Sequence, residues 1–254
     1  MKMDISAPKV CAMDFRVRVT DAGADERGSI VGVAGFLQEI AAHHARLLGF
    51  GTARLNESGV TWVLAREYVE MRRYPVYGES VRVETWPASL ERSRARRDFR
   101  ILDADGAELG VATSVWAPMD LATRRLGTIP EGMSADFPET PCHSVELPGR
   151  AVSRLRDVEA EARILARRGD IDVNGHVNNV HFFEWALECL PGDTACRPAT
   201  LDISFRAEAV AGQVILARCA RQDDGSMLHA LVREDDGAEV ARVRTTWASS
   251  SEGR

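Results

Sequence analysis

The sequence predicts an α+β fold in which one unit, made of a strand, a helix and about four antiparallel strands, occurs twice. The first observation is an internal repeat: residues 105–108 and 236–239 both have the sequence Asp-Gly-Ala-Glu, and Trp-Ala follows each at identical spacing. The second is a helical apolar pattern upstream of each turn, and the third is a proline-rich segment between the copies. Joined edge to edge, the units would form one continuous sheet with two helices against it.

β-Hairpins are predicted around both Asp-Gly turns, because segments rich in β-forming residues flank each of them. These segments are 98–102 and 111–116 in the first copy, and 228–232 and 240–247 in the second. Another pair of extended segments precedes each hairpin, with a turn at Gly78 or Gly212: 62–71 and 79–85, then 200–206 and 213–219.

One amphipathic helix is predicted in each copy from apolar residues at helical spacing. In the first copy these residues are Val33, Leu37, Ile40, Ala41 and Leu48. In the second copy they are Val180, Phe183, Leu187 and Leu190. Because a helix cannot cover its own apolar stripe, we expect a curved sheet to wrap around each one.

The segment between the copies is predicted to be a linker. Residues 127–149 hold four of the ten prolines and little apolar periodicity,. We therefore expect an N-terminal repeat at 10–126, a linker at 127–150 and a C-terminal repeat at 151–249.

Composition and charge exclude some classes of function. The chain has 254 residues, with 32 Lys and Arg against 38 Asp and Glu, so its net charge of -6 does not favour nucleic acid as a partner,. A basic run at 92–97 suits the docking of an acidic carrier protein or a phosphorylated carrier molecule, but a solvated strand face is the more common meaning of such a run,.

The termini and the cysteines indicate the compartment. The first ten residues lack the basic start and apolar core of a secretory signal, and no apolar stretch approaches the roughly 20 residues that span a bilayer,. We expect a cytoplasmic protein without a membrane span. Its five cysteines, without close metal-type spacing, are expected to be free thiols: Cys11, Cys142, Cys189, Cys196 and Cys219,.

The densest polar cluster lies at 168–179, directly before the second predicted helix. In it Asp172, Asn174 and His176 alternate, and in an extended segment such side chains point the same way,. A carboxylate, an amide and an imidazole that converge can orient a substrate and move a proton. The structural alternative is that the Asp and Asn residues make turn hydrogen bonds and that Asn178 or Asn179 caps the helix. Capping does not account for His176.

The first copy lacks this trio of residues. When Gly28 is matched with Gly175, the trio falls opposite residues without an amide or an imidazole: Asp25, Arg27 and Ser29. We therefore expect one site per chain, in the second copy.

Motifs in both halves of the chain match one known family. In the second half these are residues 170–179, with Trp185 and Glu188 on the helix that follows. In the first half they are Leu37-Gln38-Glu39 with His43-His44, Trp62-Val63-Leu64, Arg73-Tyr74-Pro75, Thr85-Trp86 and Arg97-Asp98-Phe99. Over about residues 14–248 the chain resembles the acyl-acyl carrier protein thioesterases.

The resemblance implies a tandem (double) hotdog fold, in agreement with the repeated unit. It implies hydrolysis of the thioester between a fatty acyl chain and the phosphopantetheine arm of acyl carrier protein, without a metal or a redox cofactor. It also implies that the first repeat holds the acyl chain and sets its preferred length. Because one chain already contains two hotdog units, we expect a monomer or a homodimer.

By the same resemblance, the catalytic residues are Asp172, Asn174, His176 and Glu208. Ala209 stands where plant members have a Cys, so a cysteine nucleophile is not available there. The simplest mechanism is attack by water, with Glu208 and His176 as candidate bases, Asn174 positioning the water or the carbonyl, and Asp172 orienting its neighbours. Amides of the helix N-terminus would stabilise the oxyanion. Attack by Glu208 itself, through an anhydride, is the alternative.

Three other functions remain open at this point. An acyl-CoA thioesterase would share the bond chemistry, and a hotdog dehydratase would give an enoyl product instead. A non-catalytic acyl-binding module would bind the thioester and release no thiol.

The remaining helical histidines are expected to be structural. His43 and His44 are adjacent on a helix, so they diverge and suit surface or core packing better than metal binding,. His181 is expected to face away from the site.

Overall fold

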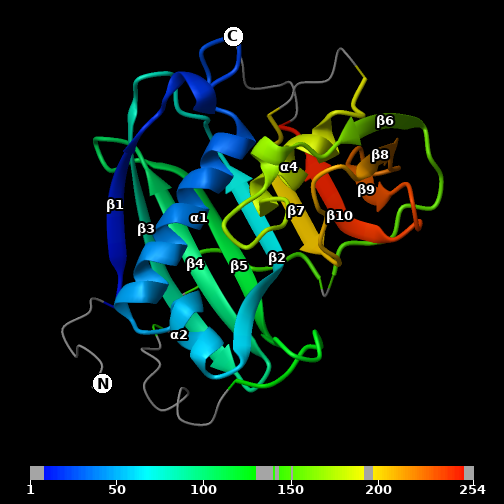
Figure 1. The fold of residues 1–254 in the computed structure, drawn as a ribbon. Coiled ribbons are helices and arrows are strands. Elements are labelled where there is room, and N and C mark those ends of the chain that lie inside the picture. Colours follow the sequence, from blue (N-terminus) through cyan, green and yellow to red (C-terminus); the bar gives the residue numbers. More distant parts are fainter. Residues whose placement is uncertain (1–8, 130–139, 141–142, 150, 192–196, 249–254) are drawn as a thin grey trace.

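The computed structural model describes residues 9–129, 140, 143–149, 151–191 and 197–248. In these residues one antiparallel sheet of ten strands has the order β1-β3-β4-β5-β2-β7-β10-β9-β8-β6. Helices α1 and α4 contact each other, and Figure 1 shows them on one face of the sheet. The predicted α+β class and the single continuous sheet are confirmed.

Apart from α2, which only the first repeat has among the described residues, the two copies contain equivalent elements in the same order. The first repeat consists of β1 (Cys11–Arg16), η1 (Val19–Asp21), α1 (Ile30–Leu47), α2 (Thr52–Glu57), β2 (Val60–Met71), β3 (Ser80–Glu91), β4 (Arg94–Leu102) and β5 (Glu108–Asp120). The second repeat consists of β6 (Ala160–Leu165), η2 (Arg168–Asp170), α4 (Asn179–Leu187), β7 (Thr200–Phe205), β8 (Val214–Arg221), β9 (Met227–Arg233) and β10 (Glu239–Thr246). Every predicted strand and helix is present; α2 was not predicted, because its six residues are too few to show a helical period,.

The repeats meet at β2 and β7, which are neighbours at the centre of the sheet. β2 does not pair with β3, the next strand in the chain, but with β5 on one side and β7 on the other. At the centre of this arrangement Glu67 lies opposite Ser114 on β5 and Ile203 on β7. The join covers two strand edges that separate repeats would leave exposed.

Each helix begins at a polar cap and buries an apolar face. The Ser29 hydroxyl accepts a hydrogen bond from Gly32 N at 3.0 Å and starts α1,. The side chain of Asn178 accepts from Val180 N at 3.3 Å, so Asn178 rather than Asn179 caps α4. Burial of one large apolar side chain contributes roughly 1.5–3 kcal/mol, so the α1 face is a major part of the core: Val33, Leu37, Ile40 and Ala41 are all buried.

An ion pair crosses the join on the sheet face opposite to Glu67. Arg66 and Asp202 are both buried, with Nη2 and Oδ2 at 2.6 Å. The same guanidinium donates to the carbonyl oxygens of Pro148 and Gly149, each at 3.0 Å. The part of the predicted linker that the structure describes is therefore attached to this face of the sheet.

The basic run at 92–97 is only partly a solvated strand face. Arg92 and Arg94 are exposed. Arg97 is buried and donates to His44 Nδ1 at 3.0 Å and to Thr85 Oγ1 at 3.2 Å. The expectation of a solvated face was wrong at Arg97, because its side chain points to the interior face of β4.

Candidate active site

The predicted polar cluster forms a tight loop between η2 and α4. Asp172 N donates to His176 O at 2.9 Å, and Gly175 N donates to Asp172 O at 3.0 Å. Gly175 has φ 82°, a left-handed conformation that favours glycine,. The expected extended geometry, in which alternate side chains converge, was therefore wrong. An Asp side chain bonds the backbone two residues on and stabilises a turn instead.

Asp172 and Asn174 are bonded to each other within this loop. Asp172 Oδ1 accepts from Asn174 N at 2.8 Å, and Asp172 Oδ2 accepts from Asn174 Nδ2 at 3.2 Å. Asn174 is exposed. The turn hydrogen bonds of the structural alternative are thus confirmed, and the catalytic roles of these two residues stay predictions.

His176 and Glu208 are brought together, although they are on different elements. His176 Nε2 lies 3.1 Å from Glu208 Oε2, and both side chains are partly open to solvent. The hydrogen bond from Val177 N to Ala209 O, at 2.8 Å, holds the loop against the segment after β7. A carboxylate in this position can orient an imidazole ring.

Arg124, from the first repeat, is the second partner of the Glu208 carboxylate. Its guanidinium forms an ion pair with Glu208 Oε2. Arg124 follows β5 in a left-handed conformation, with φ 57°, and its amide donates to Asp120 O at 2.9 Å. Sequence reasoning missed this residue because a contact across 84 positions leaves no local pattern. The candidate site therefore contains residues of both repeats.

A corresponding loop in the first repeat has the same backbone hydrogen bonds. Gly23 N donates to Arg27 O at 2.8 Å, as Asp172 N does to His176 O. Gly28 N donates to Pro75 O at 2.7 Å, the equivalent of the bond that Val177 makes. The match of Gly28 with Gly175 was therefore wrong by two residues.

The error has a conformational cause. Glu26 adopts φ 61° at the position of Gly175, so a left-handed residue is present in both loops but only one is glycine. In the structural match, the trio of the second repeat lies opposite Gly23, Asp25 and Arg27. The first repeat still lacks the amide and the imidazole, so the expectation of one site per chain does not depend on the error.

The other helical histidines have structural partners. His44 is buried against Arg97, and His43 Nδ1 lies 3.2 Å from the guanidinium of Arg46, as expected for core and surface packing. His181 lies 4.0 Å from Asp170 and 3.5 Å from Glu184.

A second cluster of titratable groups lies in the core of the second repeat. Ligand-type atoms of Cys189, Cys219 and His229 lie within 4.8 Å of one another, and all three residues are buried. Thiols and imidazoles are ligands for zinc, but each thiol here donates to a main-chain carbonyl, at 3.3 Å for Cys189 and 3.2 Å for Cys219. His229 Nε2 lies 2.9 Å from Thr245 Oγ1, and burial lowers the pKa of this histidine to about 4. The hydrogen bonds account for the cluster as part of the core.

These thiols do not supply a nucleophile beside His176. Cys219 and Cys189 are 0% and 5% exposed, and their imidazole neighbour is His229. Cys142 and Cys196 lie outside the described residues.

A small, narrow cavity of about 20 Å³ lies between α1, α4 and the centre of the sheet. Most of its lining is apolar and comes from the first repeat, with Ala34, Leu37 and Ala41 on α1 and Phe99 on β4 among the residues. Asn179, three positions after His176, also lines it. Part of the cavity lining therefore lies close in sequence to the loop that holds His176.

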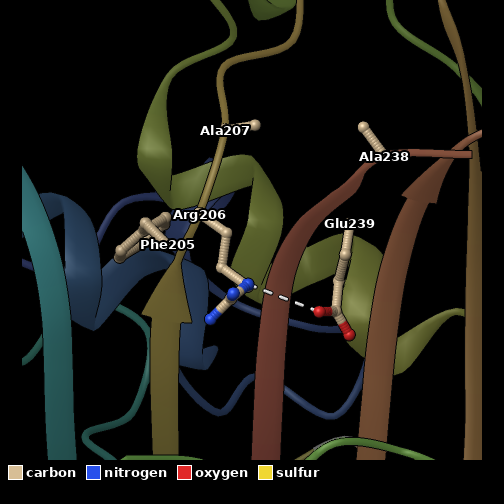
Figure 2. A pocket seen from close by; sticks show the side chains of 5 residues that line it. All are labelled: Phe205, Arg206, Ala207, Ala238 and Glu239. Carbon is tan, nitrogen blue, oxygen red and sulfur yellow. Dashed lines mark ion pairs between the residues drawn. The ribbon is translucent and has the colours of Figure 1, made fainter. Parts of the chain in front are cut away.

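A shallow, open hollow lies beside the segment that directly precedes Glu208. Figure 2 shows its side chains, which come from the end of β7 and the start of β10: Phe205, Arg206, Ala207, Ala238 and Glu239. Arg206 Nε lies 3.4 Å from Glu239 Oε2. Charged groups and an open shape make this hollow unsuitable for an alkyl chain, whereas the lining of the cavity between the helices is mostly apolar,.

Two family profiles cover most of the chain. The first, described as the Acyl-ACP thioesterase N-terminal domain, matches residues 8–137. The second, described as the Acyl-ACP thioesterase C-terminal domain, matches residues 154–249.

Curated relatives are similar over nearly the whole chain. A palmitoyl-acyl carrier protein thioesterase of Cuphea hookeriana is 33% identical over 258 residues, which cover 94% of this chain and 62% of the relative. An oleoyl-acyl carrier protein thioesterase of Coriandrum sativum is 30% identical over 284 residues, covering 94% of this chain and 77% of the relative. The chain thus spans less than two thirds of the Cuphea protein.

Two solved structures are similar in fold and sequence. A 12:0-ACP thioesterase from Umbellularia californica has a TM-score of 0.85 and 28% identity, covering 95% of this chain and 98% of that one. An acyl-ACP thioesterase from Bacteroides thetaiotaomicron has a TM-score of 0.84 and 27% identity, covering 94% and 97%. The double hotdog architecture is therefore confirmed, and the chain belongs to the acyl-ACP thioesterase family.

Proposed function

We propose that this chain hydrolyses fatty acyl-acyl carrier protein thioesters to free fatty acid and carrier protein. The observation that carries the proposal is the 3.1 Å contact between His176 Nε2 and Glu208 Oε2, next to an apolar cavity between two helices. Membership of the acyl-ACP thioesterase family supports the thioester as the bond that is cleaved.

In the proposed mechanism, Glu208 orients His176 and His176 takes a proton from water. The hydroxide oxygen bonds to the thioester carbonyl carbon, and the positive end of the α4 dipole, at the N-terminus of that helix, stabilises the negative oxygen. When the tetrahedral intermediate collapses, its C–S bond breaks and His176 returns the proton to the departing sulfur. Asp172 and Asn174 hold the loop in position, and Arg124 positions the Glu208 carboxylate.

The closest alternative substrate is an acyl-CoA, which contains the same bond on the same pantetheine arm. Thiol release should be measured from acyl carrier protein and CoA substrates of equal chain length, with His176→Ala as the control. We expect a higher kcat/KM with the carrier protein. Equal or higher kcat/KM with CoA would identify the chain as an acyl-CoA thioesterase.

The same assay addresses the two remaining alternatives. A dehydratase would give an enoyl thioester of lower mass without thiol release. A non-catalytic module would bind the acyl thioester and release no more thiol than His176→Ala does. Either result would contradict the proposed hydrolysis.

We infer that one chain is sufficient for activity. Arg124 of the first repeat and Glu208 of the second meet within a single chain, so the site does not require a second copy. Specific activity should then be independent of protein concentration across any monomer-to-dimer transition seen by light scattering.

A further inference from the structure

A buried carboxyl group lies inside the cavity and has no part in the proposed hydrolysis. Glu67 is on β2, is only 7% exposed, and is among the residues that line the cavity. Its neighbours across the strands are Ser114 and Ile203. Within the part of the chain that the structure describes, the Glu67 carboxyl group has neither a hydrogen bond nor an ion pair.

Burial changes the protonation of this group. Removal from water raises the pKa of Glu67 from 4.5 to about 8. At neutral pH the side chain is therefore mostly a carboxylic acid, which can both donate and accept a hydrogen bond. An uncharged acid of this kind suits an uncharged polar ligand group and not a cation.

Other polar side chains line the same cavity. Ser114 Oγ, directly across from Glu67, accepts a hydrogen bond from Trp116 Nε1 at 2.8 Å and donates to Arg97 O at 3.5 Å, so it can still accept from a ligand,. Gln38 on α1 is exposed and Asn179 at the start of α4 is half-buried, so these two lie towards solvent while Glu67 lies at the floor. The lining is thus apolar at most positions and polar at Gln38, Glu67, Ser114 and Asn179.

A plain alkyl chain would leave the Glu67 carboxyl group without a hydrogen-bond partner. A polar group that is buried without a partner costs on the order of 1–3 kcal/mol. A site built to hydrogen-bond a substrate hydroxyl rejects the analogue that lacks it far more strongly than an apolar pocket rejects a change of size. An apolar side chain at position 67 would suit an alkyl chain better than a carboxylic acid does.

We propose that Glu67, together with Ser114 and Asn179, forms a polar subsite in the acyl cavity that selects acyl chains bearing a hydroxyl group. The proposal rests on the proposed function, because it takes the cavity between α1 and α4 as the place of the acyl chain. The hydroxyl donates to or accepts from the Glu67 carboxyl group while the rest of the chain contacts the apolar lining.

The test compares acyl carrier protein substrates of one chain length, either unsubstituted or with a single hydroxyl at successive carbons. For the wild-type chain we expect kcat/KM at least about tenfold higher for one hydroxylated position than for the unsubstituted chain, which corresponds to loss of one buried hydrogen bond. Preference for the unsubstituted chain at every position would overturn the proposal.

Three variants separate selectivity from general damage. Glu67→Met is similar in size and apolar, so it should reduce the hydroxyl preference to within about twofold by raising kcat/KM for the unsubstituted chain. Glu67→Gln keeps donor and acceptor atoms and should keep the preference. Glu70→Met is the control on the opposite face of the same strand, where Glu70 accepts from the Tyr68 hydroxyl at 3.3 Å, and it should leave the preference unchanged. An unchanged ratio in Glu67→Met would contradict the assignment.

A binding measurement keeps this test independent of hydrolysis. Affinities of the same substrates for His176→Ala should show the same hydroxyl preference, and Glu67→Met in that background should remove it. If no substrate releases thiol, the proposed hydrolysis fails, while the affinities still decide the subsite. Equal affinities for the hydroxylated and unsubstituted chains would reject the subsite even if hydrolysis is observed.

Discussion

The loops before α1 and α4 share a backbone and differ in their chemical groups. Where the second repeat has His176, the first has the exposed Arg27. Where the second has Glu208, the first has Tyr74, which is buried and donates to Pro198 O at 2.8 Å. The hydrogen-bonded frame of the loop is therefore a property of the fold, and the proposed chemistry depends on two side chains placed on that frame.

The interiors of the two repeats also differ. Small side chains on α1 border the cavity in the first repeat, whereas aromatic side chains on α4 fill the corresponding space in the second. On α1 the residues that face the sheet include Ala34 and Ala41, and these small side chains leave room for the cavity. On α4 the corresponding face has Phe182 and Phe183, whose rings pack against Phe205 with centroids 5.9 and 6.4 Å away. Space for a ligand lies mainly in one repeat and the candidate catalytic groups mainly in the other, so each repeat depends on its neighbour.

The largest expected effect tests the difference between the two loops. His176→Ala should lower kcat/KM for thiol release by about 10²–10⁴-fold, the usual contribution of a general base. Arg27→Ala changes the matching position of the first repeat and should stay within a few-fold of wild type. Steady-state kinetics on one acyl carrier protein substrate checks both. Similar losses in the two variants would remove His176 from its proposed role.

The next effect concerns the join between the repeats. Asp202→Asn removes the charge that pairs with the buried Arg66, and loss of one partner of a buried ion pair costs about 3–5 kcal/mol,. Asp14→Asn is the control, because Asp14 is 71% exposed in its ion pair with Arg82 and should cost less than about 1 kcal/mol,. Urea unfolding gives both free energies. Equal small losses would show that the join does not depend on this pair.

The sequence predicted the features that depend on neighbouring residues and missed those that depend on contacts between distant residues. Asp-Gly turns and apolar periodicity are local, so both hairpins and both long helices were predicted correctly. Strand order is not local, and nothing near β2 indicates that it lies between β5 and β7. The alignment of the first repeat with the second was wrong for a different reason. Gly28 was matched with Gly175, but the residue that adopts the same left-handed conformation as Gly175 is Glu26.

The candidate site shows the same division. His176 was found from a local motif, and Glu208 was assigned only by resemblance to the family. Arg124 and Glu67 were not found, because an ion pair between repeats and a polar group in a cavity depend on tertiary structure. The geometry expected for the alternating trio was incorrect, since the loop is closed by hydrogen bonds of Asp172, and the catalytic roles of its three residues stay predictions.

We predict that the stability of the fold depends on pH through Glu67. Its neighbour on β7, Ile203, has no titratable group and makes no such contribution. The pKa of Glu67 rises from 4.5 to about 8 on folding, so the folded state binds more protons than the unfolded state between these values. Stability should therefore fall as pH rises from 4.5 to 8, by on the order of a few kcal/mol. Glu67→Gln should remove this slope and melt at higher temperature than wild type at pH 8. If the melting temperatures of the two proteins changed with pH in the same way from pH 5 to 9, this would contradict the claim that burial raises the pKa of Glu67.

Glu208→Gln sharpens the contrast between the candidate site and the open hollow at the end of β7. The amide keeps the shape but removes the charge that faces His176, so kcat/KM should fall about 10²-fold and the pH profile should change,. Glu239→Gln alters a carboxylate of the open hollow, which pairs with Arg206, and should have little effect on turnover. Near-wild-type turnover by Glu208→Gln would remove it from the mechanism.

The smallest expected effect tests whether the space in the first repeat sets acyl chain length. Ala41→Val adds two methyl groups at a residue that lines the cavity, so kcat/KM should fall about tenfold for the longest accepted chain and little for short ones,. Ala42→Val is the matched control, because the next residue on α1 is exposed and has the same helix-propensity cost without filling the cavity,. A uniform loss across chain lengths in Ala41→Val would indicate a general packing defect, and no loss would place the acyl chain outside this cavity.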